Sequence, residues 1–130
     1  MDKDWEDAAR SGDARALAEQ LAVGAAVDAL DRYGQSALML AAVRGHLAAV
    51  RVLIDAGASL DTTAKHGLSA TMLAAVNHHE AIARALAEAG ADLSIEGSGA
   101  PGFAGKTASD LARAAGLEAL AADLAPRKPE

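Results

Sequence analysis

A short phrase recurs in this chain at an interval of thirty-three residues. Residues 54–61 read IDAGASLD and residues 87–94 read AEAGADLS, with alanine, glycine and leucine at matching places. Self-similarity at a period of this size is typical of proteins in which small structural units stack in a row. The period therefore predicts an open row of packed units and argues against a globule built around a central parallel sheet.

The repeat divides the chain into four units. The best copy fills residues 31–63 and reads DRYGQSALMLAAVRGHLAAVRVLIDAGASLDTT, and residues 64–96 follow it in register. A truncated first copy without its opening turn occupies residues 4–30. The last copy occupies residues 97–125 and begins with five extra residues within EGSGAPGFAGK.

Each unit carries the signals of two short helices. Ser36 and Ser69 stand where a side-chain oxygen can accept hydrogen bonds from the free amides at a helix start. Apolar residues then recur at helical spacing up to Gly45, and again up to Gly57, where glycine can take the left-handed conformation that ends a helix. Such short helices are marginal alone, so each unit must bury its apolar face against the next. The polar stretch at residues 58–67 predicts a projecting hairpin.

Composition agrees with thin, closely packed helices in one domain spanning residues 1–130. Apolar residues make up 52% of the chain, but alanine dominates them and Trp, Tyr and Phe each occur once. Alanine is the best helix former because it loses no side-chain entropy. The polar, proline-bearing residues 126–130 are expected to be a frayed tail.

Charge and cysteine content exclude several classes of function. A formal net charge of −6 argues against general binding to nucleic acid or to an anionic membrane. The absence of cysteine excludes disulfides and thiolate metal sites. The first residues lack the pattern of a signal peptide, and no apolar run is long enough to span a bilayer. A cytoplasmic location is expected, or a periplasmic one if a signal segment has been removed.

The repeated motifs resemble those of the ankyrin repeat family, in particular of small bacterial members with about four repeats. The resemblance rests on GQSALMLAAVRGH at residues 34–46 and AGASLD at residues 56–61, and it extends from about Asp4 to Leu124. It implies an all-α solenoid of stacked helix-turn-helix pairs with projecting β-hairpin loops. The family commonly has Thr-Pro-Leu-His at the start of the first helix, where this chain has Ser-Ala-Leu-Met and Ser-Ala-Thr-Met. We therefore expect methionine packing in place of a histidine network between neighbouring units.

The resemblance also implies a function. It predicts a monomeric, non-catalytic scaffold or adaptor without cofactors, which binds another protein on the concave surface formed by hairpin tips and the outer part of the first helices. An immunity or enzyme-protecting role belongs to the same class and stays open. The positions of this chain that match the concave surface are Arg32, Tyr33, Gln35, Val43, Arg44, Lys65, His66, Leu68, Val76, Asn77, Phe103 and Lys106.

Charges are expected to be sorted between the two sides of the row. Acidic residues fall on the second helices or the turns behind them, whereas the cations of the inner side are Arg10, Arg32, Arg44, Lys65 and Lys106. This pattern indicates a basic groove for a partner with an acidic patch, with solvated residues that serve solubility as the alternative. Tyr33 is the best single anchor for a partner, unless its ring packs across neighbouring hairpins.

Two further features have a structural and a functional interpretation. Trp5 matches the leucine of the first helix, where it is expected to cap the exposed end of the row, with partner binding as the alternative. The five-residue expansion predicts a long, mobile hairpin tip. It is either an insertion without consequence or a clamp that contacts a partner through Phe103.

A nucleotide-binding protein is the alternative from another class. Residues 100–107 read APGFAGKT and fit the looser form of a phosphate-binding loop, in which Lys106 would hold phosphates and Thr107 would meet magnesium. The repeat frame explains Gly105 and Thr107 without a nucleotide, and no parallel sheet remains to support the loop.

Metal binding and catalysis find little support in the sequence. His46 and His79 match the Gly-His turn of the repeat and are expected to be structural. His66 and His78 have no cysteine or ordered carboxylates beside them. No serine, histidine and aspartate set is apparent, so an enzyme is not expected.

Overall fold

The computed structural model describes residues 1–126, which form eight α-helices and one short 3-10 turn. The predicted frayed tail lies outside the described residues, apart from Pro126. The helices are α1 (Lys3–Ser11), α2 (Ala14–Ala22), α3 (Ala37–Val43), α4 (Leu47–Asp55), α5 (Ala70–Val76), α6 (Glu80–Glu88), α7 (Ala108–Ala114) and α8 (Glu118–Asp123), and the turn η1 is Lys65–Gly67.

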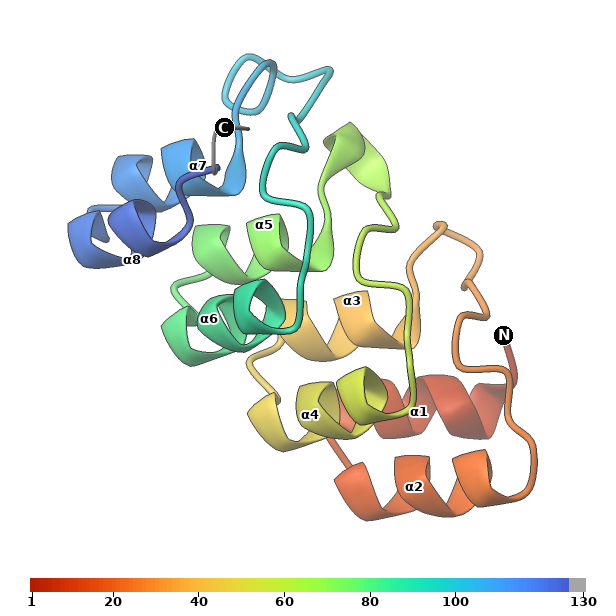
Figure 1. Ribbon diagram of the computed structural model, residues 1–130. Helices are drawn as coiled ribbons and strands as arrows, with labels where there is room; N and C mark the ends of the chain where they lie inside the picture. The colour runs from red at the N-terminus through yellow and green to blue at the C-terminus, as the bar shows by residue number, and fades with distance from the viewer. Residues whose placement is uncertain (127–130) are drawn as a thin grey trace.

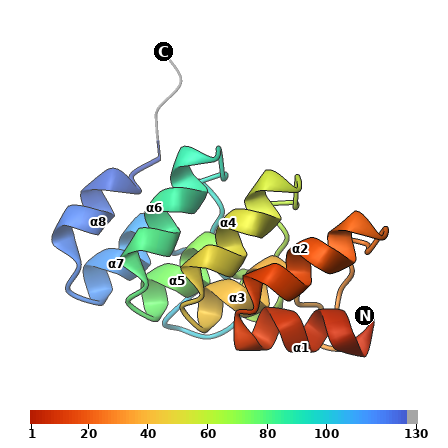
Figure 2. The ribbon, with the colours of Figure 1, turned by 90° about the horizontal axis from the view of Figure 1, so that it is seen from below.

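The helices form two parallel layers that follow the order of the repeats (Figures 1 and 2). One layer contains the first helices α1, α3, α5 and α7, and the other contains the second helices α2, α4, α6 and α8. Successive helices contact each other within each layer. The predicted all-α solenoid of four helix pairs is confirmed. Within residues 1–126, no helix combines the length and the apolar character needed to cross a bilayer.

The predicted hydroxyl caps begin the first helices of the three later units. Ser36 Oγ accepts from the amide of Met39 at 3.3 Å, and Ser69 Oγ accepts from the amide of Met72 at 3.4 Å. The amide of Ser69 donates in turn to the Met72 sulfur at 3.5 Å, so methionine completes the capping box that glutamate usually completes. Met39 and Met72 are each 1% exposed, which confirms that methionine fills this space by packing.

The core lies between the two layers and continues from one repeat to the next. Every residue of α3 from Ala37 to Ala42 is buried, because α3 packs against helices on several sides. Leu53, Leu86 and Leu124 occupy the same place in successive repeats and have no exposed surface. Trp5 is 2% exposed at the first end of the row, as the predicted cap requires.

The loops between repeats project from the helices but do not form the predicted β-hairpins. Within residues 1–126 no strand forms, and the loop after α2 has only an isolated antiparallel bridge between Leu30 and Ser36. The physical reason lies in Asp31, whose Oδ1 accepts from the amides of Tyr33 at 2.8 Å and of Gln35 at 2.9 Å. The side chain thus satisfies amides that a longer ladder of strand pairs would otherwise satisfy.

Carboxylates tie each loop to the next one. Asp28 Oδ1 accepts from the amide of Ser59 at 2.8 Å, and Asp61 Oδ1 accepts from the amide of Asp92 at 2.8 Å. The two bonds occupy equivalent places one repeat apart. They hold the bases of the three loops in a fixed row.

Histidines of the turns within the pairs also join neighbouring repeats. His46 Nε2 donates to the carbonyl oxygen of Arg10 at 2.9 Å, and His79 Nε2 donates to the carbonyl oxygen of Val43 at 3.2 Å. The structural role expected for these histidines fits this geometry. The expectation that histidine bonds between neighbours are absent was wrong, because they arise here from the turns instead of the helix starts.

The turn of the third repeat carries a strained residue. His78 has a φ of 63° where the other repeats place glycine, for example Gly45 with a φ of 81°. A residue with a side chain loses about 1–2 kcal/mol of stability in this left-handed region. Glycine avoids this strain but loses more backbone entropy on folding, which costs about 0.5–1 kcal/mol and offsets part of the gain. We expect His78→Gly to raise the free energy of unfolding by about 0.5–1 kcal/mol in urea denaturation. Unchanged or lower stability would show that the His78 side chain makes compensating contacts.

Candidate functional site

The residues expected to form the binding surface fall into two groups in the structure. The three loops project side by side on one side of the helices (Figure 1). The loops carry Arg32, Tyr33, Gln35, Lys65, His66, Phe103 and Lys106, and the C-terminal ends of α3 and α5 carry Val43, Arg44, Val76 and Asn77. The groups lie at opposite ends of helices that have seven residues, about 10 Å of helix axis. They form the two edges of one long face.

Most of these residues are accessible, but Leu68 is not. Arg32, Arg44, Lys65, Asn77 and Lys106 are exposed. Leu68 is 4% exposed and belongs to the hydrophobic core. Its carbonyl oxygen accepts from the amide of Ala64 at 3.2 Å and closes the loop just before α5, so the apolar side chain turns inward. The expected exposure of Leu68 was wrong; the polar residues at the equivalent places, Gln35 and Lys106, remain accessible or half-buried.

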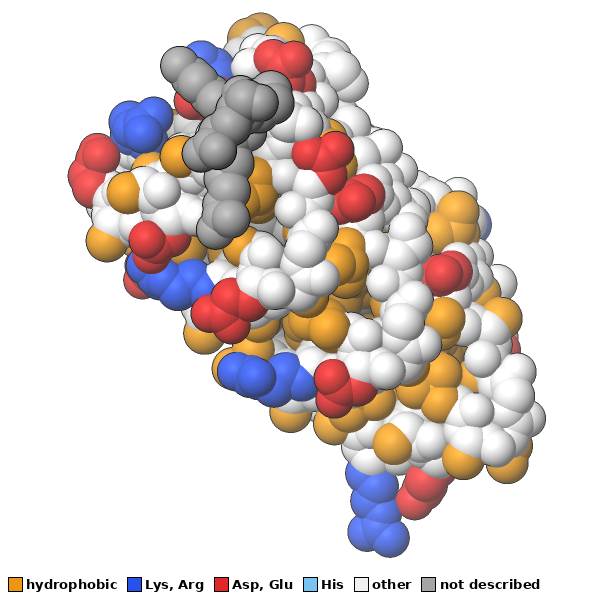
Figure 3. Space-filling view, in the orientation of Figure 1, with side chains coloured by type: hydrophobic (Ala, Val, Ile, Leu, Met, Phe, Trp, Pro, Cys, Tyr) orange, Lys and Arg blue, Asp and Glu red, His pale blue; other side chains and the backbone are white. Residues whose placement is uncertain are grey.

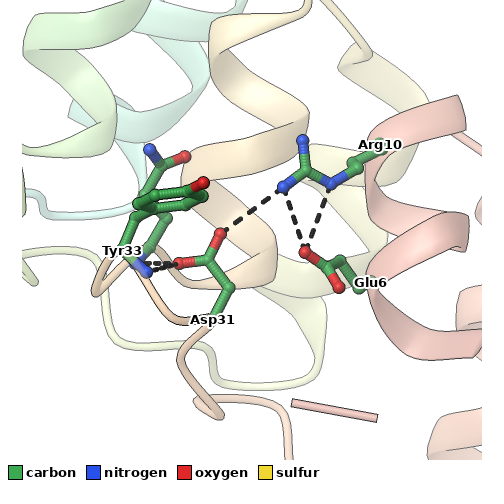
Figure 4. A network of polar contacts seen from close by, with 5 residues as sticks. Glu6, Arg10, Asp31 and Tyr33 are labelled. Atoms are coloured by element: carbon green, nitrogen blue, oxygen red, sulfur yellow. Dashed lines mark hydrogen bonds and ion pairs between the residues drawn. The ribbon is translucent and has the colours of Figure 1, made fainter. Parts of the chain in front are cut away.

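Arg10 does not contribute a free charge to this face (Figure 4). Its Nη2 lies 3.0 Å from Glu6 Oε1 and 3.6 Å from Asp31 Oδ2. The Asp31 side chain is 2% exposed, so this pair is largely shielded from solvent. Glu6 was not among the predicted site residues, although its spacing of four residues from Arg10 on one helix is the signal of an ion pair.

Tyr33 is the most accessible ring of the face. It is 60% exposed, and the Arg32 guanidinium carbon lies 5.0 Å from the centre of its ring. This distance falls within the range of a cation–π interaction, which is modest at an exposed site but orients the arginine. The ring is therefore not buried across neighbouring loops, and one of its contacts is a cation that itself faces solvent.

Four cations of the face have no carboxylate partner within residues 1–126: Arg32, Arg44, Lys65 and Lys106. On the second helices, Arg15 pairs with Glu19 at 3.1 Å and Arg84 pairs with Asp123 at 2.9 Å, whereas Arg51 of α4 has no ion pair within residues 1–126. Figure 3 shows positive and negative side chains next to each other on the face that it displays. Cations without an ion pair are thus concentrated on the face but are not confined to it.

The five-residue expansion forms a compact lobe against the preceding loop. The amide of Ser98 donates to the carbonyl oxygen of His66 at 2.7 Å, and the rings of His66 and Phe103 lie 5.2 Å apart. Within the lobe, the amide of Gly97 donates to the Lys106 carbonyl oxygen at 2.9 Å. A Cβ atom at Gly97 would collide with the backbone of Phe103, so the lobe requires glycine there. The expansion was expected to be a long, mobile hairpin tip; in the structure it is docked on its neighbour, and Phe103 is half-buried in that contact.

The stretch APGFAGKT is not built as a phosphate-binding loop. Thr107 Oγ1 accepts from the amide of Asp110 at 3.3 Å and donates to Asp110 Oδ2 at 3.1 Å, so it caps α7. The amide of Thr107 also donates to Asp110 Oδ2 at 3.0 Å, and this bond is the main cause of the lowered pKa of the Asp110 carboxyl. An ionised carboxylate thus occupies the helix start where phosphates would have to lie, and no observation favours a nucleotide.

Two remaining features of the described residues bear on function: the grouping of possible metal ligands and the large hollows of the surface. Among residues 1–126, no group of three histidine, aspartate or glutamate side chains lies close enough to hold a metal ion. Hollows of about 710 and 620 Å³ lie at the two ends of the row, beside α2 and beside the end of α6. Neither hollow contains residues of the loop tips.

Comparison with known proteins agrees with the repeat frame. A family model described as ankyrin repeats, in three copies, matches residues 6–96, which is well over half of the chain. The matched region ends where the expanded last copy begins. A search of curated proteins finds no significant match.

Proposed function

Since the chain belongs to the ankyrin repeat family, we propose that it is a non-catalytic module that binds another protein on the face between its loop tips and the C-terminal ends of α3 and α5. Ankyrin repeats generally mediate protein–protein interactions, and the family is typically non-enzymatic. An immunity or enzyme-protecting role would use the same face.

The observation that carries the proposal is the exposed pair of Tyr33 and Arg32. Tyrosine and arginine are the residue types enriched at the energetic centres of protein interfaces, because they combine apolar area with hydrogen-bonding groups. Tyr33 is 60% exposed although it is one of only three aromatic residues in the chain. The half-buried Val43 and Val76 add apolar surface at the far edge of the same face.

The experiment compares variants of the two sides of the row. The partner is identified by affinity capture from the native host, and its affinity is then measured by titration calorimetry. We expect Tyr33→Ala to weaken binding by about 2 kcal/mol, the threshold of an interface hot spot. Arg51→Ala, an exposed change on the second helix α4, is the matched control and should leave affinity unchanged. If Tyr33→Ala leaves the affinity for the partner unchanged and Arg51→Ala abolishes binding, the partner binds the second helices and the proposed face is wrong.

A further inference from the structure

Two successive loop tips present the same chemical unit. Arg32 and Lys65 occupy equivalent places one repeat apart, and both are exposed without an ion pair to any of residues 1–126. Each is followed by a ring, Tyr33 in the first tip and His66 in the second. The sequence therefore repeats a cation followed by a ring at the spacing of the repeats.

Contacts within the chain hold Arg32 in the first tip and the His66 ring in the second before any partner arrives. The contact at 5.0 Å with the Tyr33 ring orients Arg32. In the second tip, His66 has a φ of 62°, an unfavourable conformation for a side-chain residue. The docked lobe holds it there, because Ser98 donates to the His66 carbonyl oxygen and Phe103 stacks on its ring. Preorganised groups lose less conformational entropy on binding and therefore bind more tightly.

Carboxylates close to the tips are engaged inside the fold. Asp31 accepts from two amides of its own loop and faces Arg10, and Asp110 caps α7. They are held away from pairing with Arg32 and Lys65. Within residues 1–126 no carboxylate forms an ion pair with Arg32 or Lys65, so both cations are open to a carboxylate of another molecule, even though the chain as a whole carries a net charge of −6.

The spacing of the tips selects the shape of that molecule. Packed helices lie about 8–10 Å apart, so equivalent atoms of neighbouring repeats are separated by roughly that distance. A segment in the polyproline II conformation advances about 3.1 Å per residue, so about three residues cover one repeat. Because three residues make one turn of this conformation, side chains at positions i and i+3 lie on the same side of the segment and would face Arg32 and Lys65 in turn.

We propose that the loop tips bind a segment of a partner protein in the extended polyproline II conformation, in which two acidic side chains three residues apart pair with Arg32 and Lys65. Apolar side chains of the segment pack on Tyr33 and on the ring pair of His66 and Phe103. The proposal rests on the function proposed above and specifies the chemistry of the partner. It also gives the lobe a role, since the lobe fixes the ring of the second tip.

A single-stranded nucleic acid is the other ligand that could use cations beside rings. The net charge of the chain disfavours it, because a long polyanion interacts with the whole acidic surface of the protein. A short acidic segment interacts mainly with the two cations, since charges further away than about 8 Å are screened at physiological ionic strength.

The test selects peptides of about twelve random residues, displayed on phage, against the full chain; such a peptide can span all three tips. We expect the selected peptides to carry Asp or Glu at positions i and i+3. Synthetic copies should bind the double variant R32E/K65E about tenfold more weakly than the wild type, because two exposed charge pairs become repulsive. The matched control R15E/R51E makes the same change of charge on the second helices and should bind normally.

Each other outcome would overturn the proposal. Selected peptides without an acidic pair, equal binding to R32E/K65E, or no enrichment at all would each contradict it. A fluorescein-labelled oligothymidylate that binds more tightly than the peptides would assign the tips to nucleic acid instead. If R32E/K65E leaves partner affinity unchanged while Tyr33→Ala still weakens it, the proposed function stands and this inference fails. Circular dichroism of each variant checks that it is folded.

Discussion

Replacing Trp5 by alanine is expected to lower the free energy of unfolding by about 3–5 kcal/mol, the usual cost of truncating a large buried aromatic side chain. Trp5 is 2% exposed in α1 and belongs to the hydrophobic core at the first end of the row. In a solenoid each repeat is stabilised by its neighbours, so the loss at one end spreads to the next repeat. Because domains of this size are stable by only about 5–15 kcal/mol, the variant should unfold at a much lower urea concentration.

The measurement is urea denaturation followed by circular dichroism, since Trp5 is the only tryptophan and its fluorescence is lost in the variant. Tyr33→Ala is the control, because it removes an aromatic side chain that is 60% exposed and should change stability little. Trp5→Phe separates the loss of side-chain volume from the loss of the indole N–H group. Nε1 of Trp5 is buried without a hydrogen-bond partner in the described residues. Phenylalanine loses no hydrogen bond there and should cost far less than alanine. Equal stability of Trp5→Ala and the wild type would contradict the role of Trp5 as a cap.

The repeat frame was predictable because its signals are local. The hydroxyls of Ser36 and Ser69, and the glycines after the second helices, act on the backbone within a few residues of themselves. The period then places each helix pair without any knowledge of its contacts. The buried methionines followed from the same frame, since Met39 and Met72 stand at a core position of the repeat.

Contacts between repeats were harder to predict. The ion pair of Arg10 with Asp31 and the bonds of His46 and His79 join residues more than twenty positions apart, and their partners include backbone carbonyls that carry no sequence signal. The docked lobe depends on the carbonyl of His66, which is equally invisible in the sequence. The binding surface itself stays a prediction, because the exposure of its residues is known but its partner is not.

Replacing Gly45 by alanine is expected to lower the free energy of unfolding by about 2–4 kcal/mol, from a strained backbone and an overpacked contact. Gly45 has a φ of +81°, and a Cβ atom there would lie 2.7 Å from Cε1 of the His79 ring. The ring cannot easily move, because its Nε2 donates to the carbonyl oxygen of Val43 at 3.2 Å. Gly12 stands in the same relation to His46, so the contact is a repeated feature of the junctions.

Gly57 provides the control that separates the cost of backbone strain from the cost of the overpacked contact with His79. It has a φ of +82°, but a Cβ atom there would meet nothing within 4 Å. Gly57→Ala should therefore cost only the backbone strain less glycine's larger loss of entropy, about 0.5–1 kcal/mol. In a His79→Ala variant, the loss of unfolding free energy caused by Gly45→Ala should decrease to that caused by Gly57→Ala. A double-mutant cycle measured by urea denaturation gives the coupling between Gly45 and His79. If Gly45→Ala costs no more than Gly57→Ala in the wild type, the histidine ring does not fix the distance between neighbouring repeats. A large, histidine-dependent difference means that the turn histidines set the spacing of the row, and with it the distance between Arg32 and Lys65.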